Sequence, residues 1–193
     1  MKHQNVRETL IDRAITVVAE EGLDKTTTKA IVSGTGINEA YIYRCFSDKE
    51  DLLEKMFDKL DDELVTVVMQ HMAVMYMTEI DFELRCRLFF EAVWKFLLGN
   101  GEKCLAFIRY FYSPYFKNRS AESHHDRFRK VEDKFATVFI DEADVWMILN
   151  HILNIMLDFA IKVHNEQMPN SDDYSEHVYR VIYASVKQYF KSN

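Results

Sequence analysis

The chain has 193 residues, of which 48% are hydrophobic, and it carries a formal net charge of −7 at pH 7. A chain of this length buries a sizeable core, and its few glycines (5) and prolines (2) exclude long loops and many-stranded β architectures. The acidic balance excludes a general coat for nucleic acid, so any contact with DNA has to come from a local basic surface. We therefore expect an all-α protein of about nine helices.

The sequence also indicates where the protein works. It has no run of 18 or more uncharged apolar residues, and the N-terminal stretch MKHQNVRETL lacks the apolar core of a signal peptide. We expect a cytoplasmic protein with no membrane partner.

Cysteines and histidines do not form a recognisable site. Cys45, Cys86 and Cys104 are odd in number and scattered, which favours buried or half-buried thiols over disulfides or zinc ligands. His124 and His125 lie in a polar stretch and are expected to be solvated. Because catalytic motifs are also missing, we expect neither an enzyme nor a bound metal or cofactor.

Residues 5–21 are the first predicted helix, because apolar side chains recur there at spacings of three and four. Gly22 suits the position just after its C-terminus. The pattern of residues 26–53 then predicts two short helices joined by a turn that contains glycine. Thr27 or Thr28 caps the first of these, and Asn38 caps the second.

A third helix follows at once. Ser47 and Glu50 have the spacing of a capping box, and the helix that it opens is predicted to run without a break from 48 to about 76. A helix, a tight turn and a second helix is the layout of a helix-turn-helix DNA reader. The helices predicted in the remaining chain are 78–98, 102–112, 120–139, 142–166 and 171–191.

The pattern predicts two functional segments. Residues 1–50 form a helix-turn-helix DNA-binding domain, and residues 51–193 form a second helical domain. Between residues 25 and 49 there are four basic and two acidic side chains, so this segment has a local charge of +2 in a chain whose net charge is −7. That local charge permits DNA binding without proving it.

The N-terminal motifs resemble the tetracycline-repressor (TetR) family of bacterial transcription regulators. The spacing of Tyr43, Phe46 and Lys49 is more specific than helix-turn-helix periodicity alone. The sequence departs from the family pattern at Gly34 and Cys45, which bears on the operator that is read. The residues that carry the resemblance are Ala14, Gly22-Leu23, Thr27-Thr28, Gly36-Ile37, Ile42-Tyr43, Phe46, Lys49-Glu50 and Leu52-Leu53.

The resemblance and the chemistry of the side chains together give a set of candidate DNA contacts. The cap and first turn of the first short helix suit phosphates, and the exposed start of the second suits the major groove. Two alternatives remain open: Tyr43 packs in the core of the reader, and Arg44 is solvated. The candidate contacts are Thr27, Thr28, Lys29, Asn38, Glu39, Ala40, Tyr41, Tyr43, Arg44 and Lys49.

The resemblance implies that residues 51–193 form an effector-binding and dimerisation domain. It places a small-molecule pocket among the central helices and a two-fold dimer through the last two helices. Aromatic stripes of this kind are also typical of plain core, and a monomeric bundle is the alternative to the dimer. The predicted pocket residues are Phe90, Trp94, Phe107, Tyr110, Phe111, Tyr115 and Trp146. The predicted interface residues are Leu149, Ile152, Met156, Phe159, Val178, Ile182 and Val186.

The sequence therefore predicts a homodimeric, sequence-specific transcriptional regulator. It would bind a near-palindromic operator in double-stranded DNA as a repressor and leave it on binding a small amphipathic or aromatic effector. One alternative is an activator or co-regulator whose C-terminal domain binds a protein. Another is a helical binding module without DNA recognition.

Overall fold

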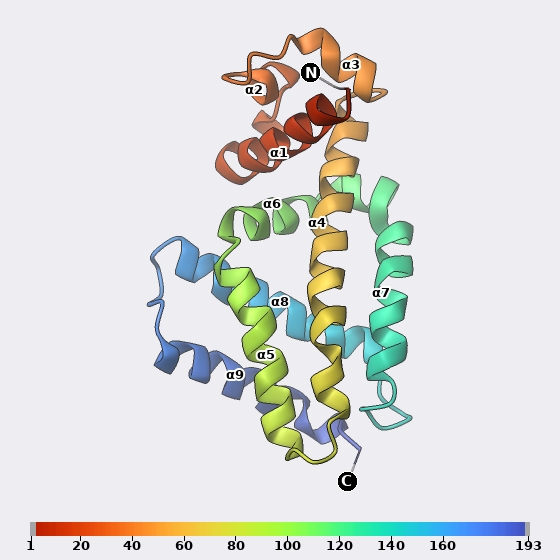
Figure 1. Cartoon of the computed structure of the whole chain (residues 1–193), viewed down its shortest axis with the longest axis vertical. Helices are drawn as coiled ribbons and strands as arrows, with labels where there is room; N and C mark the ends of the chain where they lie inside the picture. Colours follow the sequence, from red (N-terminus) through yellow and green to blue (C-terminus); the bar gives the residue numbers. More distant parts are fainter. Residues whose placement is uncertain (1–2, 192–193) are drawn as a thin grey trace. The chain divides into compact units, whose positions relative to one another are not determined.

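The computed structural model describes residues 3–191, which contain nine α-helices and no strand (Figure 1). The predicted all-α fold is confirmed. The chain folds as two compact units, of which the first holds residues up to 63 together with 102–125, and the second holds 64–101 together with 126 onward. The helices α4 (Lys49–His71) and α7 (Ala121–Phe135) contribute to both. The division after residue 50 concerns roles, and it stays a prediction.

The N-terminal part of the first unit is built around α1 (His3–Glu21), which contacts the next two α-helices. Its apolar stripe is enclosed, with Leu10, Ala14 and Val18 fully buried. Gly22 has a φ of 85°, which turns the chain sharply after α1 at no steric cost. The elements that follow are η1 (Leu23–Lys25), α2 (Thr28–Val32), η2 (Glu39–Tyr41) and α3 (Ile42–Cys45).

The rest of the first unit packs on the N-terminal part of α4. Phe57 of α4 is fully buried, and its ring centroid lies 5.0 Å from that of Phe107 and 4.8 Å from that of Tyr110. The elements that supply this second layer are α6 (Gly101–Phe111), the π-helical turn η4 (Phe116–Ser120) and the start of α7.

The start of α4 corrects one prediction. The Asp48 carboxylate accepts a hydrogen bond from the Asp51 amide (2.7 Å), and the Asp51 carboxylate accepts one from the Ser47 amide (2.8 Å). Asp48 therefore caps the helix and Asp51 reaches back to the Ser47 amide, so the predicted pairing of Ser47 with Glu50 is wrong. A charged carboxylate is the stronger acceptor at the positive end of a helix, which explains the shift by one residue.

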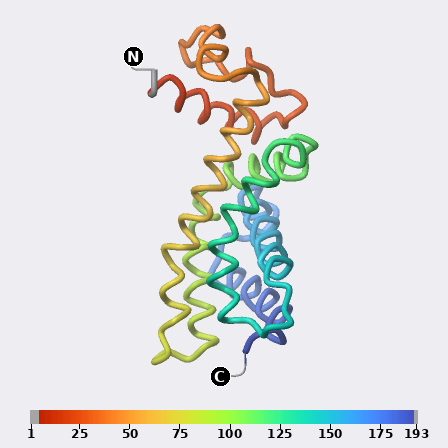
Figure 2. Tube along the Cα trace, turned by 90° about the vertical axis from the view of Figure 1, so that its right-hand side faces the viewer, coloured from red at the N-terminus to blue at the C-terminus, as the bar shows by residue number. Residues whose placement is uncertain are grey.

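The second unit is arranged around α5 (Phe82–Leu98), which contacts η3 (Met72–Tyr76), α8 (Val145–His164) and α9 (Asp172–Val186). In both views α5 returns alongside the C-terminal part of α4 (Figures 1 and 2). After η5 (Lys187–Tyr189), the chain pairs with the loop that follows α7. The amide of Ile140 donates to the carbonyl of Tyr189 (2.8 Å), and the amide of Lys191 donates to that of Val138 (3.0 Å).

The predicted helices of the second unit exist, with shifted limits. α5 ends at residue 98 as predicted but begins four residues later, α8 is shorter at both ends, and α9 begins one residue later and ends five residues earlier than predicted. Their starts are fixed by side-chain caps that periodicity does not reveal. The caps are Asp81 on the amide of Leu84 (3.2 Å), Asp144 on that of Met147 (2.9 Å) and Ser171 on that of Tyr174 (3.3 Å).

The helix α8 is unusually apolar. Among the described residues it is the one helix long and apolar enough to cross a membrane, with a mean hydropathy of 1.3 in its most apolar window. Core helices of soluble proteins also reach this level, so the finding is weak evidence for a membrane. Only 28% of that window is buried inside the chain, so α8 keeps apolar surface that its own chain leaves uncovered.

Candidate DNA interface and candidate effector pocket

Two side-chain caps define the short helices of the candidate DNA interface. The Thr27 hydroxyl accepts a hydrogen bond from the Ala30 amide (3.1 Å) at the start of α2. The Asn38 side chain accepts one from the Ala40 amide (2.9 Å) where η2 and then α3 begin. Both predicted caps are confirmed, and Thr27 is the one of the two threonines that acts. The hydroxyl of Thr28 donates to the carboxylate of Glu39, which joins α2 to η2.

Most of the predicted DNA contacts are exposed. The side chain of Tyr43 is 61% exposed, so the alternative that it packs in the core is wrong. The guanidinium of Arg44 lies 5.0 Å over the Tyr41 ring, which holds it near the surface by a cation–π contact. Thr28, Tyr41 and Lys49 are half-buried. The exposed members of the set are Thr27, Lys29, Asn38, Glu39, Ala40, Tyr43 and Arg44.

Lys49 has a partner inside the chain. Its ammonium donates to the carbonyl oxygen of Thr26 (3.2 Å) and so connects the start of α4 to the segment that enters α2. A phosphate contact by this residue would have to be made by the remaining N–H groups of the ammonium.

The C-terminal end of α1 is held by α6. One terminal nitrogen of Arg109 donates to the carbonyl oxygens of Val18 (2.7 Å) and Ala19 (2.8 Å). The last carbonyls of a helix lack partners within the helix and form its negative end, so a guanidinium stabilises them both by hydrogen bonding and by charge. Arg109 therefore fixes α1 to α6. Sequence analysis missed it, because an arginine among aromatic residues gives no sign of a distant helix end.

Four of the predicted pocket residues belong to an aromatic cluster in the first unit, around Phe57. Two hydrogen-bonded pairs of polar groups lie in this cluster. The Tyr110 hydroxyl lies 3.0 Å from that of Ser120, and the Nδ1 atom of His124 lies 2.8 Å from the Asp61 carboxylate. The predicted residues in the cluster are Phe107, Tyr110, Phe111 and Tyr115.

His124 corrects a further prediction. Its side chain is 2% exposed, so the expectation that it is solvated is wrong, while His125 is exposed as predicted. The signal was present in the sequence but hidden by polar residue types. Positions spaced four, four and three apart share one face of a helix. The buried residues at this spacing are Ser120, His124, Phe128 and Val131.

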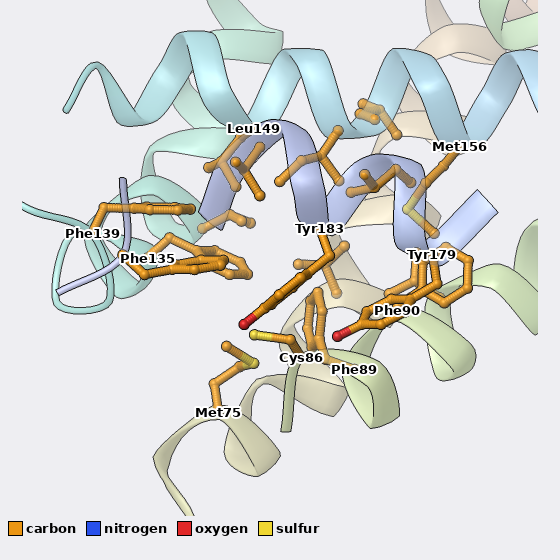
Figure 3. Close-up of a pocket in the computed structure, with 18 of the residues that line it drawn as sticks. Met75, Cys86, Phe89, Phe90, Phe135, Phe139, Leu149, Met156, Tyr179 and Tyr183 are labelled. Carbon is orange, nitrogen blue, oxygen red and sulfur yellow. The ribbon is translucent and has the colours of Figure 1, made fainter. Parts of the chain in front are cut away.

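The second unit contains an apolar hollow of about 100 Å³ (Figure 3). One wall comes from α5, whose Cys86, Phe89, Phe90 and Val93 follow helical spacing, and the others come from α4, η3, α7, α8, α9 and the C-terminal segment. Of the predicted pocket residues, Phe90 lines it. Five of the predicted interface residues also line it, namely Leu149, Ile152, Met156, Ile182 and Val186.

The remaining predicted residues lie elsewhere in the second unit. The Trp94 indole stacks on Phe90 and donates to the Ser175 hydroxyl (2.8 Å) in a wider, polar hollow of about 630 Å³ beside it. Trp146 packs edge-on against Phe128. Of the other interface candidates, Phe159 packs edge-on against Tyr174, and Val178 is buried.

The polar groups in the wall of the apolar hollow are neutral. Burial raises the pKa of the Cys86 thiol to about 12, and it also raises the pKa values of the Tyr179 and Tyr183 hydroxyls. Tyr179 donates its hydroxyl hydrogen to the Glu83 carbonyl (3.0 Å). Tyr183 makes no hydrogen bond to another described residue, and its hydroxyl lies beside the Cys86 sulfur at one end of the hollow (Figure 3). The hollow therefore presents apolar surface and one available hydroxyl.

The structure offers no metal centre over residues 3–191, where no three His, Cys, Asp or Glu side chains gather closely enough to hold an ion. Cys45 and Cys86 are half-buried and Cys104 is buried, as predicted for free thiols.

Comparison with known proteins identifies the family of the N-terminal helix-turn-helix segment. Residues 10–56 match the profile of the family described as bacterial regulatory proteins, tetR family. The chain carries a TetR-family helix-turn-helix domain. No curated protein sequence is significantly similar to the chain.

Solved structures show that the likeness to TetR-family regulators extends over the whole fold. A TetR-family transcription regulator from Marinobacter aquaeolei VT8 superposes with a TM-score of 0.78, with 100% of both chains covered and 14% identity. A protein of Shewanella sp. PV-4 assigned to the same family has a TM-score of 0.74 and 15% identity, with 96% of this chain and 98% of that chain covered. One from Vibrio parahaemolyticus has a TM-score of 0.67 and 20% identity, with 96% and 99% covered.

Proposed function

We propose that the protein is a cytoplasmic, sequence-specific transcriptional repressor that binds operator DNA as a homodimer and leaves it when a small molecule enters the second unit. The observation that carries the proposal is the set of exposed side chains on the capped helix pair of a TetR-family domain. Tyr43 is the strongest of them, because a 61% exposed tyrosine gains little from folding and much from a partner.

The geometry supports a division of roles at the DNA. The first amides of α2 and the ammonium of Lys29 suit phosphate oxygens, since a helix N-terminus and a nearby cation both attract anions. The exposed start of η2, with Asn38 and Glu39, suits base edges in the major groove. Tyr43 and Arg44 lie on the next helical turn and would hold the backbone on one side of that contact.

A dimer through α8 and α9 is supported by the apolar surface that these helices leave uncovered. Met147 on α8 and Val181 on α9 are each 53% exposed, and His151 and Ser185 join the two helices by a hydrogen bond of 3.1 Å. These outward side chains are the ones free to meet a second copy. The predicted residues that line the hollow would support the interface from behind. Two readers in a two-fold dimer then require half-sites about 34–36 Å apart.

An effector would act by linkage. If it binds more tightly to the conformation whose DNA-binding domains do not fit the operator, DNA affinity falls by a factor that is at most the ratio of its affinities for the two conformations. The uninterrupted helix α4 contributes residues to both units, so we propose it as the connection. The hollow beside α5 is the proposed effector site.

The test begins with a footprint on the DNA upstream of the protein's own gene, followed by titrations of the protected duplex at several salt concentrations. We expect Lys29→Ala and Tyr43→Ala to weaken binding at least tenfold, because a hydrogen bond to a charged phosphate contributes about 1.5–3 kcal/mol. For Lys29→Ala the log–log salt slope should also become shallower by about 0.9, the change expected when one fewer phosphate is neutralised.

Exposed residues of the same type serve as matched controls. Tyr112 is 69% exposed and Lys130 is exposed, and neither lies in the reader, so Tyr112→Ala and Lys130→Ala should bind like the wild type. The proposal fails if no duplex is protected at low salt, or if all four variants bind equally well.

A further inference from the structure

The residues that line the apolar hollow, which form its wall, include no charged side chain. They are aliphatic, aromatic or sulfur-containing, and the only polar side-chain atoms among them are the thiol of Cys86 and the hydroxyls of Tyr179 and Tyr183. A charged ligand that enters such a space loses its water and finds no ion to replace it. The wall therefore selects against anions and cations alike.

One cation close to the hollow is already paired. The guanidinium of Arg87 lies 4.5 Å over the Tyr179 ring and forms an ion pair with Glu176. The other carboxylate oxygen of Glu176 accepts a hydrogen bond from Arg180 (2.7 Å), which is exposed and screened by water. Arg87 lines the wider polar hollow and is not part of the apolar wall. Its charge is balanced by a carboxylate, so it does not make the apolar hollow a site for anions.

Arg85 is buried but is not part of the wall either. One of its terminal nitrogens donates to the carbonyl oxygen of Met75 (2.8 Å), and its guanidinium lies 5.0 Å over the ring of Phe82. Its Nε is enclosed by protein and has no hydrogen-bond partner, so it offers nothing to a ligand in the hollow. Other charged residues near this end of the second unit are exposed, and water screens them. They are Asp81, Glu83, Asp141 and Lys191.

The two tyrosines of the wall differ in what their hydroxyls bond. Their ring centroids lie 5.6 Å apart in a stacked arrangement, and the Tyr179 hydroxyl donates to the carbonyl of Glu83 (3.0 Å). The Tyr183 hydroxyl has no hydrogen-bond partner among the described residues and lies beside the Cys86 sulfur at one end of the hollow (Figure 3). A thiol sulfur is a weak acceptor, so this hydroxyl keeps a hydrogen to donate. Burial raises the pKa of Tyr183, which keeps that hydrogen in place at neutral pH.

We propose that the hollow binds a neutral apolar molecule that carries one hydrogen-bond acceptor, such as a ketone or ester carbonyl, and that the Tyr183 hydroxyl donates to this acceptor. The statement that the molecule is the effector rests on the proposed function, whereas its chemical class rests on the wall alone. A carbonyl oxygen requires a donor and no counter-ion, and the wall supplies one donor and no ion. The rest of the molecule leaves water for aromatic and aliphatic surface.

The volume limits the size of the apolar body. An engineered apolar cavity of about 150 Å³ holds benzene, so a hollow of about 100 Å³ accommodates a chain of a few carbons without rearrangement. Longer molecules require side chains of the wall to move, and Met75 and Met156 are the flexible ones among them. The methyl groups of these two methionines also report on binding at this place.

The experiment follows binding at the hollow itself by nuclear magnetic resonance. The full-length protein, without DNA, carries ¹³C in its methionine methyl groups, and Met75→Leu and Met156→Leu assign the two signals of the wall. The ligands are pentan-2-one, pentanoate, pentylammonium and pentane, which share a five-carbon chain. We expect pentan-2-one to shift both signals and to bind at least about tenfold more tightly than the anion or the cation, because each of these would be buried without a counter-ion. The signal of Met168, which is 36% exposed and outside the wall, should not move.

Two tyrosine variants separate the hydrogen bond from the packing. Tyr183→Phe should weaken the binding of pentan-2-one roughly threefold to tenfold, the loss expected when one neutral hydrogen bond is removed, and leave the affinity for pentane unchanged. Tyr174→Phe is the matched control, since the Tyr174 hydroxyl also has no hydrogen-bond partner but is not part of the wall. This variant should bind both compounds like the wild type.

Equal or tighter binding of pentanoate or pentylammonium at the two methionine signals overturns the assignment of a neutral ligand, and so does the absence of any shift with pentan-2-one. If a folded Tyr183→Phe loses affinity for pentan-2-one and pentane alike, or for neither, the role of the hydroxyl is overturned. The four compounds on the wild type decide the ligand class even if Tyr183→Phe does not fold. Since no DNA is present, a failure here leaves the operator test untouched, and a ketone that binds without releasing operator DNA removes only its role as the effector.

Discussion

The two units contain aromatic clusters of similar composition and opposite character. Around Phe57 in the first unit, the Tyr110 hydroxyl is paired with that of Ser120, and the Nδ1 atom of His124 is paired with the Asp61 carboxylate. Around Phe90 in the second unit, a hollow remains, with the Tyr183 hydroxyl unpaired and the guanidinium of Arg85 incompletely bonded. The number of aromatic residues therefore does not distinguish a core from a binding site. The state of their polar neighbours does.

The largest expected difference between the clusters comes from truncating one phenylalanine in each. Phe57→Ala should lower the free energy of unfolding by about 4 kcal/mol, because the ring is fully buried in close packing. Phe89→Ala, at the half-buried edge of an existing hollow, should cost about half as much. Urea unfolding followed by circular dichroism measures both, and equal reductions would contradict the contrast.

Disrupting the buried pair of His124 and Asp61 should cause the next largest loss in the free energy of unfolding. Asp61→Ala should cost about 3 kcal/mol, since it removes a hydrogen-bond partner from a buried imidazole. The double variant with His124→Ala should cost clearly less than the sum of the two single variants. Additive effects in the same unfolding assay would show that the pair does not act as a unit.

The thiols predict a pH dependence that both units share. Burial raises the pKa of Cys86 and of Cys104 from 9.0 to about 12, so the folded state keeps a proton that the unfolded state releases. The stabilisation of the folded state by the two neutral thiols is fully present below pH 9.0. It is lost progressively as the pH rises toward 12. At pH 10 each thiol should reduce the free energy of unfolding by about 1 kcal/mol relative to pH 8. The variant Cys86→Ala/Cys104→Ala should show a flatter profile, and an unchanged slope would refute the assignment.

The smallest effects should come from removing single hydroxyls. Tyr110→Phe should cost about 1 kcal/mol, because it breaks the bond to Ser120 in a closed cluster. Tyr183→Phe should change stability by less than about 0.5 kcal/mol, since the hydroxyl has no partner within the described chain. A larger effect for Tyr183→Phe would mean that its hydroxyl is bonded in solution and that the end of the hollow is already satisfied.

The sequence predicted the parts of the molecule that depend on local chemistry. The helices follow from apolar periodicity, and Thr27 and Asn38 cap their helices as expected, because a cap acts within three residues. At the start of α4, Asp48 and not Ser47 caps the helix, because a charged carboxylate is the stronger acceptor. Apolar periodicity carries no information about this choice.

The site could be predicted only in part, because it depends on which helices meet. Phe107 and Tyr110 were grouped with Phe90 as one pocket, but α6 and α5 contribute to different units. Leu149 and Ile182 were assigned to an interface because α8 and α9 are apolar, yet their side chains face the hollow. Composition shows that a helix is apolar, whereas only the packing shows which neighbouring helix or hollow each of its faces contacts. Whether the exposed residues of the reader contact DNA stays a prediction.

The two bonds from Arg109 to the end of α1 have a consequence for building chimeric regulators. A DNA-binding domain cut out as residues 1–50 and fused to another sensor would lack this guanidinium, which holds the C-terminal end of α1. Residues 102–125 lie far along the chain from the reader but fold with it. A functional transplant would therefore have to carry both segments, so the exchangeable module of this protein is discontinuous in sequence.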